Sequence, residues 1–139
     1  ALLQQGHIRS TPEAIQHALE RAPMHYQRSR IAELSSIEGL FWAMVDSAQA
    51  ALMAANLTPP SPEHIPENLM QAFVNKKLLK RKYVEQYADL YAIHKKIDHG
   101  EISSLRGVEI DEWQERTEEF MGVMAKLVKS VFLKKVKKR

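Results

Sequence analysis

The residues best suited to chemistry lie in one short segment, IHKKIDHG, which runs from Ile93 to Gly100. It contains two histidines, His94 and His99, with two lysines and an aspartate between them. A pair of histidines can act as general base and general acid, because the ring gains and loses a proton near neutral pH. A lysine beside them would stabilise negative charge that develops during the reaction. The segment is therefore a candidate for acid–base catalysis, for a degraded form of it, or for a polar helix end without function.

The spacing of the two histidines does not suit a shared pocket on one helix. Five residues place His94 and His99 about 140° apart around the helix axis, whereas His94 and Asp98 share a face. Two simpler interpretations remain open. His94 continues an apolar stripe and would be a hydrogen-bonded histidine at the edge of the core, and His99 would interact with the negative end of the helix dipole. A metal site of His94, Asp98 and His99 is not expected, because two of the three diverge and no fourth ligand has a useful spacing.

The composition predicts one soluble globular domain. The chain has 139 residues, of which 45% are apolar and 27% are charged, the balance of a folded domain with a single core. Cysteine is absent, which excludes disulfides and a cysteine zinc site and makes a reducing cytoplasm the expected location. No apolar run approaches the roughly 18–20 residues that span a bilayer, so no membrane is expected as a partner. The net charge of +3 does not identify a nucleic-acid binder, although the last six residues, KKVKKR, could attract RNA phosphates.

No standard enzyme motif is present. The sequence contains no P-loop, no dinucleotide-binding G-x-G-x-x-G, no H-E-x-x-H zinc motif and no G-x-S-x-G nucleophile elbow. The carboxylate pairs Asp111–Glu112 and Glu118–Glu119 are interpreted as solvated charges. Trp42 and Trp113 are interpreted as packing or dimer-contact residues. Neither a cofactor nor a metal ion is expected.

Apolar residues recur at helical spacing throughout and never with a period of two, which predicts an all-α protein. Capping signals, prolines and one glycine divide the pattern into about five helices of a mostly antiparallel, up-and-down bundle. A single domain covers residues 1–139, in which residues 1–9 are expected to be disordered or part of a helix and residues 134–139 to form a basic tail. The expected helices are one that begins at Ser10 and is kinked by Pro23, one from Ser35 to about Asn56, a short one from about Glu67 to Val74, one that contains Tyr83 to Ile97 and ends before Gly100, and one that contains Ile110 to Val131.

The apolar surface of such a bundle favours association. Long apolar stripes on the helices of residues 35–56 and 110–131 exceed what one small bundle covers. We therefore expect a homodimer, formed through the helix that ends before Gly100 and its neighbours. A second stripe on the helix of residues 35–56 would let another helix approach closely, because its members are small: Ala43, Ser47, Ala50 and Ala54.

The order of these elements and their residues resemble the HEPN family of prokaryotic helical domains. The resemblance extends from about Ser10 to Val131. It rests on the alanine-rich segment LFWAMVDSAQAALMAAN, the proline loop TPPSPEHIPENL, the helix ending LYAIHKKIDHGE and the amphipathic helix VEIDEWQERTEEFMGVMAKLV. It implies a helical bundle that forms a symmetric dimer and binds RNA or nucleotides, in many members as a metal-independent ribonuclease. It also implies a small nucleotidyltransferase as a partner in a toxin–antitoxin pair.

The ribonuclease motif of that family, R-x(4–6)-H, is only partly present. His99, followed by Gly100, stands at the position of the histidine, and His94 stands at the position of the arginine. Arginine is always charged and grips phosphate with a two-pronged fork, whereas histidine has no fork and an ordinary pKa of about 6.5. The resemblance therefore implies a dimeric domain that binds RNA or nucleotides, or partners a nucleotidyltransferase, with weak or absent catalysis. Where some members carry a modifiable tyrosine, this chain has Glu101.

An active enzyme is the alternative. If His94 of one copy met His99 of the other across a two-fold axis, the separation of the two rings around one helix would no longer matter. The protein would then be a metal-independent endoribonuclease, the toxin of a toxin–antitoxin pair, with the two histidines as acid and base. Under either hypothesis, we expect Lys95, Lys96 and Arg106 to bind the phosphate groups of the ligand.

Overall fold

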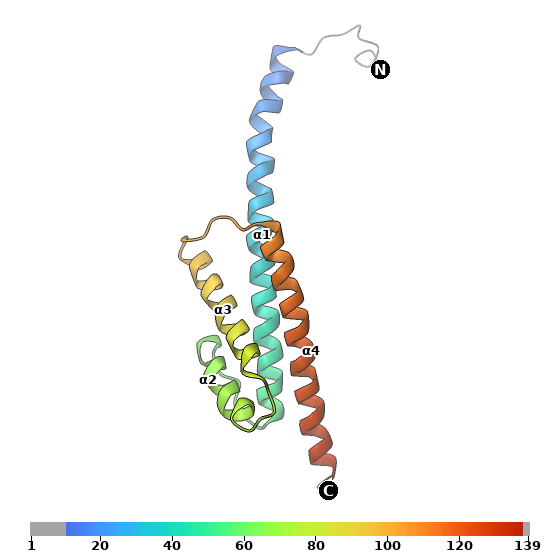
Figure 1. Ribbon diagram of the computed structural model, residues 1–139. Helices are drawn as coiled ribbons and strands as arrows, with labels where there is room; N and C mark the ends of the chain where they lie inside the picture. The colour runs from blue at the N-terminus through green and yellow to red at the C-terminus, as the bar shows by residue number, and fades with distance from the viewer. Residues whose placement is uncertain (1–10, 138–139) are drawn as a thin grey trace.

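The structure, a computed structural model, describes residues 11–137, which form helices and connecting loops without a β-strand (Figure 1). The all-α class is confirmed, but this part of the chain forms four α-helices, so the prediction of about five is wrong. Residues 1–9 and the last two residues of the expected basic tail lie outside the described range. The elements are α1 (Pro12–Ala54), a 3-10 turn (Pro62–His64), α2 (Ile65–Leu69), a π-helical turn (Met70–Val74), α3 (Arg81–Asp98) and α4 (Gly107–Lys137).

The first two expected helices are one. α1 continues through Pro23 and through the break expected at Ser35. The hydroxyl of Ser36 donates to the carbonyl oxygen of Ala32, four residues earlier, over 3.0 Å. A serine inside a helix bonds in this way, whereas a serine at a helix start bonds forward to an N–H group. The capping signal at Ser35 therefore does not start a new helix, and residues 35–38 continue α1.

The long helices do not simply alternate in direction. α3 runs antiparallel to α1, and α4 then runs in the same direction as α1, beside its C-terminal half (Figure 1). The loop of residues 99–106 crosses the end of the bundle and makes this return possible. α3 is therefore antiparallel to both α1 and α4. The most extensive helix pair, α1 with α4, is parallel. The expectation of a mostly antiparallel bundle is corrected accordingly.

A single core lies between α1, α3 and α4, with α2 and its flanking turns at one end. Phe41, Phe73, Tyr87 and Phe120 are among its largest fully buried side chains. Burial of one such aromatic side chain stabilises the fold by roughly 1.5–3 kcal/mol. Trp113 is also buried and packs as expected. No helix in the described part of the chain combines the length and the apolar character that crossing a membrane requires.

The proline loop between α1 and α2 is tied to the bundle by two hydrogen bonds. The hydroxyl of Tyr87 donates to the carbonyl oxygen of Pro62 over 2.7 Å. The side-chain amide of Gln49 donates to the carbonyl oxygen of Pro60 over 2.9 Å. Burial raises the pKa of Tyr87, which keeps its hydroxyl a donor. The loop is therefore held against both α1 and α3.

Candidate functional site

α3 ends inside the segment IHKKIDHG in the way that its glycine predicts. Gly100 has a φ of 72°, a left-handed conformation that glycine adopts without strain. Its N–H donates to the carbonyl oxygen of Ile97, and the next N–H along the chain donates to the carbonyl oxygen of Lys96. This pair of bonds is a Schellman motif, which closes the helix. His94 therefore lies within α3, whereas His99 is the residue at which the helix ends.

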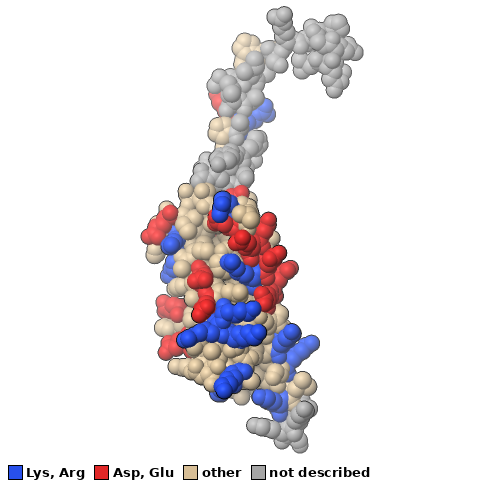
Figure 2. Space-filling model, in the orientation of Figure 1, with Lys and Arg blue, Asp and Glu red and all other residues tan. Residues whose placement is uncertain are grey.

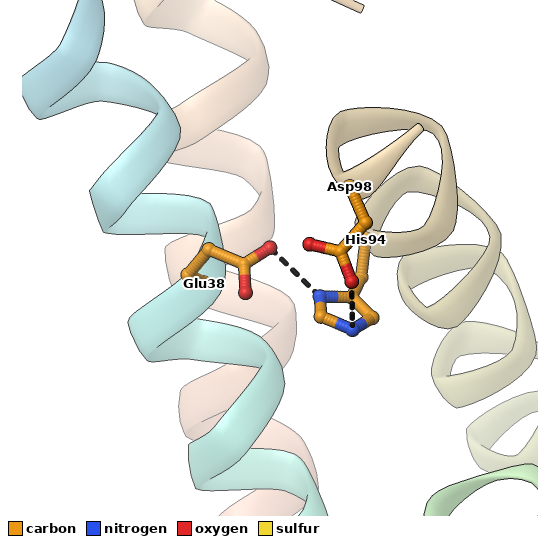
Figure 3. A group of neighbouring side chains, drawn as sticks. All are labelled: Glu38, His94 and Asp98. Carbon is orange, nitrogen blue, oxygen red and sulfur yellow. Dashed lines mark hydrogen bonds and ion pairs between the residues drawn. The ribbon is translucent and has the colours of Figure 1, made fainter. Parts of the chain in front are cut away.

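His94 is buried between α1 and α3. Its ring lies on the ring of Phe41, with 4.2 Å between the centroids and 10° between the planes. Its Nδ1 lies 2.7 Å from Oε1 of Glu38, and its Nε2 lies 3.4 Å from Oδ2 of Asp98 (Figure 3). Only 11% of the His94 side chain is exposed. This arrangement matches the interpretation of His94 as a hydrogen-bonded histidine at the edge of the core.

Both ring nitrogens of His94 face carboxylates, which limits the chemistry that this ring can do. A neutral imidazole has one N–H and donates to only one carboxylate, whereas an imidazolium donates to both. In either form, proton exchange with a ligand would require one of the two contacts to open. We call Glu38, His94 and Asp98 the His94 cluster. Its geometry is that of a contact between α1 and α3.

Glu38 is the member of the His94 cluster that the sequence analysis missed. Its place three residues after Ser35 predicts a helix cap, but in the continuous α1 its carboxylate binds His94 instead. The two residues are 56 positions apart in the chain. The only sequence signal for a buried role of Glu38 was its place between the apolar residues Ile37 and Phe41. That place does not show that His94 is its partner.

The His94 cluster also satisfies a distance criterion for a metal site, since one ligand atom from each residue lies within 4.8 Å of the others. The two carboxylates, however, face different nitrogens of one ring. A metal bound to one nitrogen would have the nearer carboxylate as a direct ligand, while the other carboxylate would orient the ring. Two direct protein ligands fall short of the three or four that a zinc site uses. The geometry fits an ion-pair cluster better than a metal centre.

The two histidines of the segment do not meet within one chain. His99 is exposed at the end of α3, while His94 is buried in its cluster. A composite site built from two copies, as in the ribonuclease alternative, would have to draw His94 away from Glu38 and Asp98.

The expected phosphate ligands Lys95, Lys96 and Arg106 are all exposed, but two of them contact their own chain. The Nζ of Lys95 lies 5.5 Å from the centroid of the Tyr91 ring. The Nε of Arg106 donates to Oε1 of Glu109 over 2.7 Å, and this hydrogen bond raises the pKa of the guanidinium. Lys95 and Lys96 could bind a phosphate without breaking a hydrogen bond or ion pair. Arg106 would first have to break its hydrogen bond with Glu109.

A small hollow of about 240 Å³ opens beside the His94 cluster. Its lining includes Trp42, Tyr91, Pro62 and Lys95. Trp42 is 48% exposed and packs edge-on against Phe41, so it is a packing residue at the surface of the core. The aromatic walls suit a flat ring, and the charged groups of the lining are one cation, Lys95, and one carboxylate, Glu63.

A denser group of positive charges lies at the other end of α3. The run NKKLLKRK, residues 75–82, leads into the helix, and buried Leu79 anchors it to the core. In the view of Figure 2, lysine and arginine side chains are most frequent in the middle and lower part of the molecule, with some acidic side chains beside them. From the sequence this run reads only as a polar, basic turn, although its charge density was a signal for a binding surface. We use the name basic segment for its five exposed cations, Lys76, Lys77, Lys80, Arg81 and Lys82.

Comparisons of this chain with protein families, with curated proteins and with solved structures returned no match. The resemblance to the HEPN family therefore rests on the residues quoted for it.

Proposed function

We propose that this chain is a HEPN-like domain that binds RNA through the basic segment, with weak or absent catalysis. The observation that carries the proposal is the density of exposed positive charge, five cations within seven residues. Such a cluster neutralises neighbouring phosphates of one strand and releases the counterions that surround them. The resemblance to the HEPN family favours RNA among the possible polyanions.

The fold alone gives these cations little reason to gather where they do. Lys80 is the N-cap of α3, and Arg81 and Lys82 belong to its first turn, which contains no acidic residue. The N-terminal end of a helix carries a partial positive charge, so additional cations there repel it. Lys82 is compensated by a contact of 3.5 Å with Glu119. The remaining cations repel one another and the N-terminal end of α3. A polyanion bound over the basic segment would attract both and offset this repulsion.

Catalysis by the two histidines is not part of this proposal, because His94 already serves the α1–α3 contact. Its ring is stacked on Phe41 and held by two carboxylates. A base must reach the proton that it removes to within hydrogen-bond distance. His94 would reach a ribose hydroxyl only after the His94 cluster had opened.

A single nucleotide in the hollow beside the His94 cluster is a second candidate ligand. The half-exposed ring of Trp42 offers a face for a base, and such stacking contributes roughly 1–3 kcal/mol per base. Lys95 lines the same hollow and could hold a phosphate. This site lies at the opposite end of α3 from the basic segment, so mutations separate the two candidates.

Two matched double variants test the proposal. Lys80→Gln/Arg81→Gln removes two charges from the basic segment, and Lys95→Gln/Lys96→Gln removes two charges beside the hollow. Binding of a fluorescent single-stranded RNA is measured by anisotropy between about 50 and about 200 mM salt. The first variant should bind more weakly, and its slope of log affinity against log salt should fall by about 1.4, roughly 0.7 for each lost phosphate contact.

The second variant should keep the affinity and the slope of the wild type. Unchanged RNA binding in the Lys80→Gln/Arg81→Gln variant would overturn the basic segment as the RNA site. Loss of binding in the second variant alone would favour the hollow and a nucleotide ligand.

A small nucleotidyltransferase, the partner that the resemblance implies, is a separate proposal. Co-purification with the product of a neighbouring nucleotidyltransferase gene would test it. Loss of RNA binding on formation of that complex would show that the partner covers the basic segment.

A further inference from the structure

The side of α4 that faces away from the core changes the sign of its charge at the middle of the helix. Core residues such as Trp113, Phe120 and Leu127 point to the opposite side. Figure 2 shows acidic side chains on the upper part of the edge that α4 forms and basic side chains further down. We call this side the α4 stripe, and its exposed members are Asp111, Glu115, Glu118, Gly122, Lys126 and Lys129.

The helix dipole does not account for the α4 stripe. Acidic residues near the N-terminus and basic residues near the C-terminus of a helix are favourable, but only within its first and last turns. Glu115 and Glu118 lie more than two turns after the start of α4, and Lys129 lies more than two turns before its end. The reversal of charge therefore points to a partner outside the chain.

Gly122, at the midpoint of the stripe, is not required by the packing of its own chain. It is exposed, and a Cβ placed there would meet no atom within 4 Å. Glycine weakens the interior of a helix relative to alanine. The absence of a side chain does, however, let a second helix approach closely. The position has the property expected where two helices cross.

Beside the stripe, α1 and α4 leave an open groove of about 710 Å³, whose lining includes Leu40, Ala43, Thr117 and Met121. Thr117 is only 2% exposed, and its hydroxyl has no hydrogen-bond partner among the described residues. Met121 is still 44% exposed. Acidic residues of the stripe, Glu118 among them, rim this groove. It has the lining expected of a surface that receives a basic, partly apolar helix.

We propose that a second copy of this chain packs its α4 antiparallel across this one, with the two-fold axis at Gly122. Residues at equal distances on opposite sides of Gly122 then face each other. Glu118 is four residues before it and faces Lys126 of the second copy, which is four residues after it. Glu115 faces Lys129 of the second copy in the same way, and the symmetry repeats both pairs.

The second copy is the occupant that the charges favour, because the acidic groove and the basic half of α4 belong to the same chain. Leu133, 61% exposed near the basic end of α4, would reach the acidic end of the groove on the second copy. The sequence predicted a dimer formed through the helix that ends before Gly100. That helix is α3, whose apolar side packs against the core of its own chain, where Tyr83, Tyr87 and Leu90 are buried. The inference goes beyond RNA binding and does not depend on it.

Two charge variants test the proposal. The facing pairs occupy positions 115, 118, 126 and 129. Glu115→Lys/Glu118→Lys makes all four positions basic, and Lys126→Glu/Lys129→Glu makes all four acidic. Each variant alone should show a dimer Kd raised about tenfold or more, because like charges then face each other. An equal mixture should form a heterodimer at least as tightly as the wild type, because every facing pair is then opposite in charge. Light scattering after size exclusion reports the mass, which for the wild type should be about twice 16.0 kDa.

A matched control reverses two charges on α3. Lys95→Glu/Lys96→Glu should leave the Kd of the dimer unchanged, and circular dichroism should show that all variants are folded. A monomeric wild type at high micromolar concentration would overturn the proposal and leave a helix of another protein as the occupant. Failure of the two folded charge variants to form a heterodimer would also overturn it, as would dissociation caused by the α3 control alone.

The orientation has its own readout, because the chain contains no cysteine. Under oxidation, Glu118→Cys mixed with Lys126→Cys should form a disulfide-linked dimer that neither variant forms alone. Cross-linking within each single variant would instead indicate parallel helices and contradict the antiparallel arrangement.

Discussion

The ring of His94 on α3 lies flat against the ring of Phe41 on α1, with 4.2 Å between the centroids and 10° between the planes. The stacking holds the edge of the imidazole between Glu38 and Asp98, so an aromatic contact and two polar contacts act on one side chain. A protonated ring would also be attracted to the aromatic face beneath it. His94 is therefore a packing residue of the α1–α3 interface, which governs what its replacement should do.

Replacement of His94 by alanine should lower the free energy of unfolding by about 2–4 kcal/mol. The ring leaves a cavity above Phe41, and the partly buried Glu38 loses its partner. His99→Ala should change the stability by less than about 0.5 kcal/mol, because that side chain is exposed. Urea denaturation of both variants beside the wild type measures the difference. Equal effects would show that the His94 cluster does not hold the two helices together.

Replacement of His94 by arginine restores the motif of the HEPN family, but it should not raise RNA cleavage. The new guanidinium would meet Glu38 and Asp98 before any phosphate, and carboxylates are favourable bidentate partners for it. The measurement is decay of mixed RNA in the presence of EDTA. Faster decay in His94→Arg that disappears in His94→Arg/His99→Ala would contradict this expectation and support the ribonuclease alternative.

Glu119 should contribute to the acid sensitivity of the fold. Its pKa is lowered from the ordinary value by the hydrogen bond from the Tyr83 hydroxyl, at 2.9 Å, and by Lys82. A carboxyl group with a lower pKa in the folded chain stabilises the fold above its unfolded pKa, and this contribution is lost as the pH falls through the folded pKa. Glu119→Gln should therefore lose less stability than the wild type between about pH 7 and about pH 3. Thermal unfolding of the variant and the wild type across that range tests it, and an identical pH dependence of the two would contradict it.

Tyr87→Phe should destabilise the fold by about 1 kcal/mol, the typical contribution of one hydrogen bond. The variant keeps the buried ring but removes the donor to Pro62, which leaves that carbonyl oxygen without this bond. Tyr91→Phe, in the next turn of α3, is the matched control and should cost less than about 0.5 kcal/mol because its side chain is only half-buried. Thermal denaturation gives both values, and indistinguishable midpoints would mean that the tether of the proline loop contributes nothing.

Helical periodicity predicted which faces of α3 and α4 are buried. Tyr87 and Phe120 belong to the apolar repeats of these helices and are fully buried, whereas Met121, in the same repeat of α4, is 44% exposed. This success follows from geometry, since residues three and four apart share a face whatever the rest of the chain does. Gly100 was predictable for a similar local reason, because the conformation that closes α3 suits glycine.

Features that depend on distant residues were not predictable. The capping signal at Ser35 is local, and α1 nevertheless continues through it. The contact of Glu38 with His94 joins positions 56 apart, and no spacing rule connects them. The direction of α4 depends on the path that α2, α3 and their loops take, which periodicity does not specify.

α1 and α4 lie side by side although all of α2 and α3 separates them in the sequence (Figure 1). On the ribosome α1 emerges first, and the side that α4 covers has no partner until that helix has followed. At roughly 5–20 residues per second, synthesis of the intervening chain takes on the order of seconds. During this interval the nascent chain presents an uncovered apolar surface to the solvent. A chain whose synthesis stalls before α4 would have an incomplete core. At that stage a chaperone would find the largest exposed apolar surface to bind.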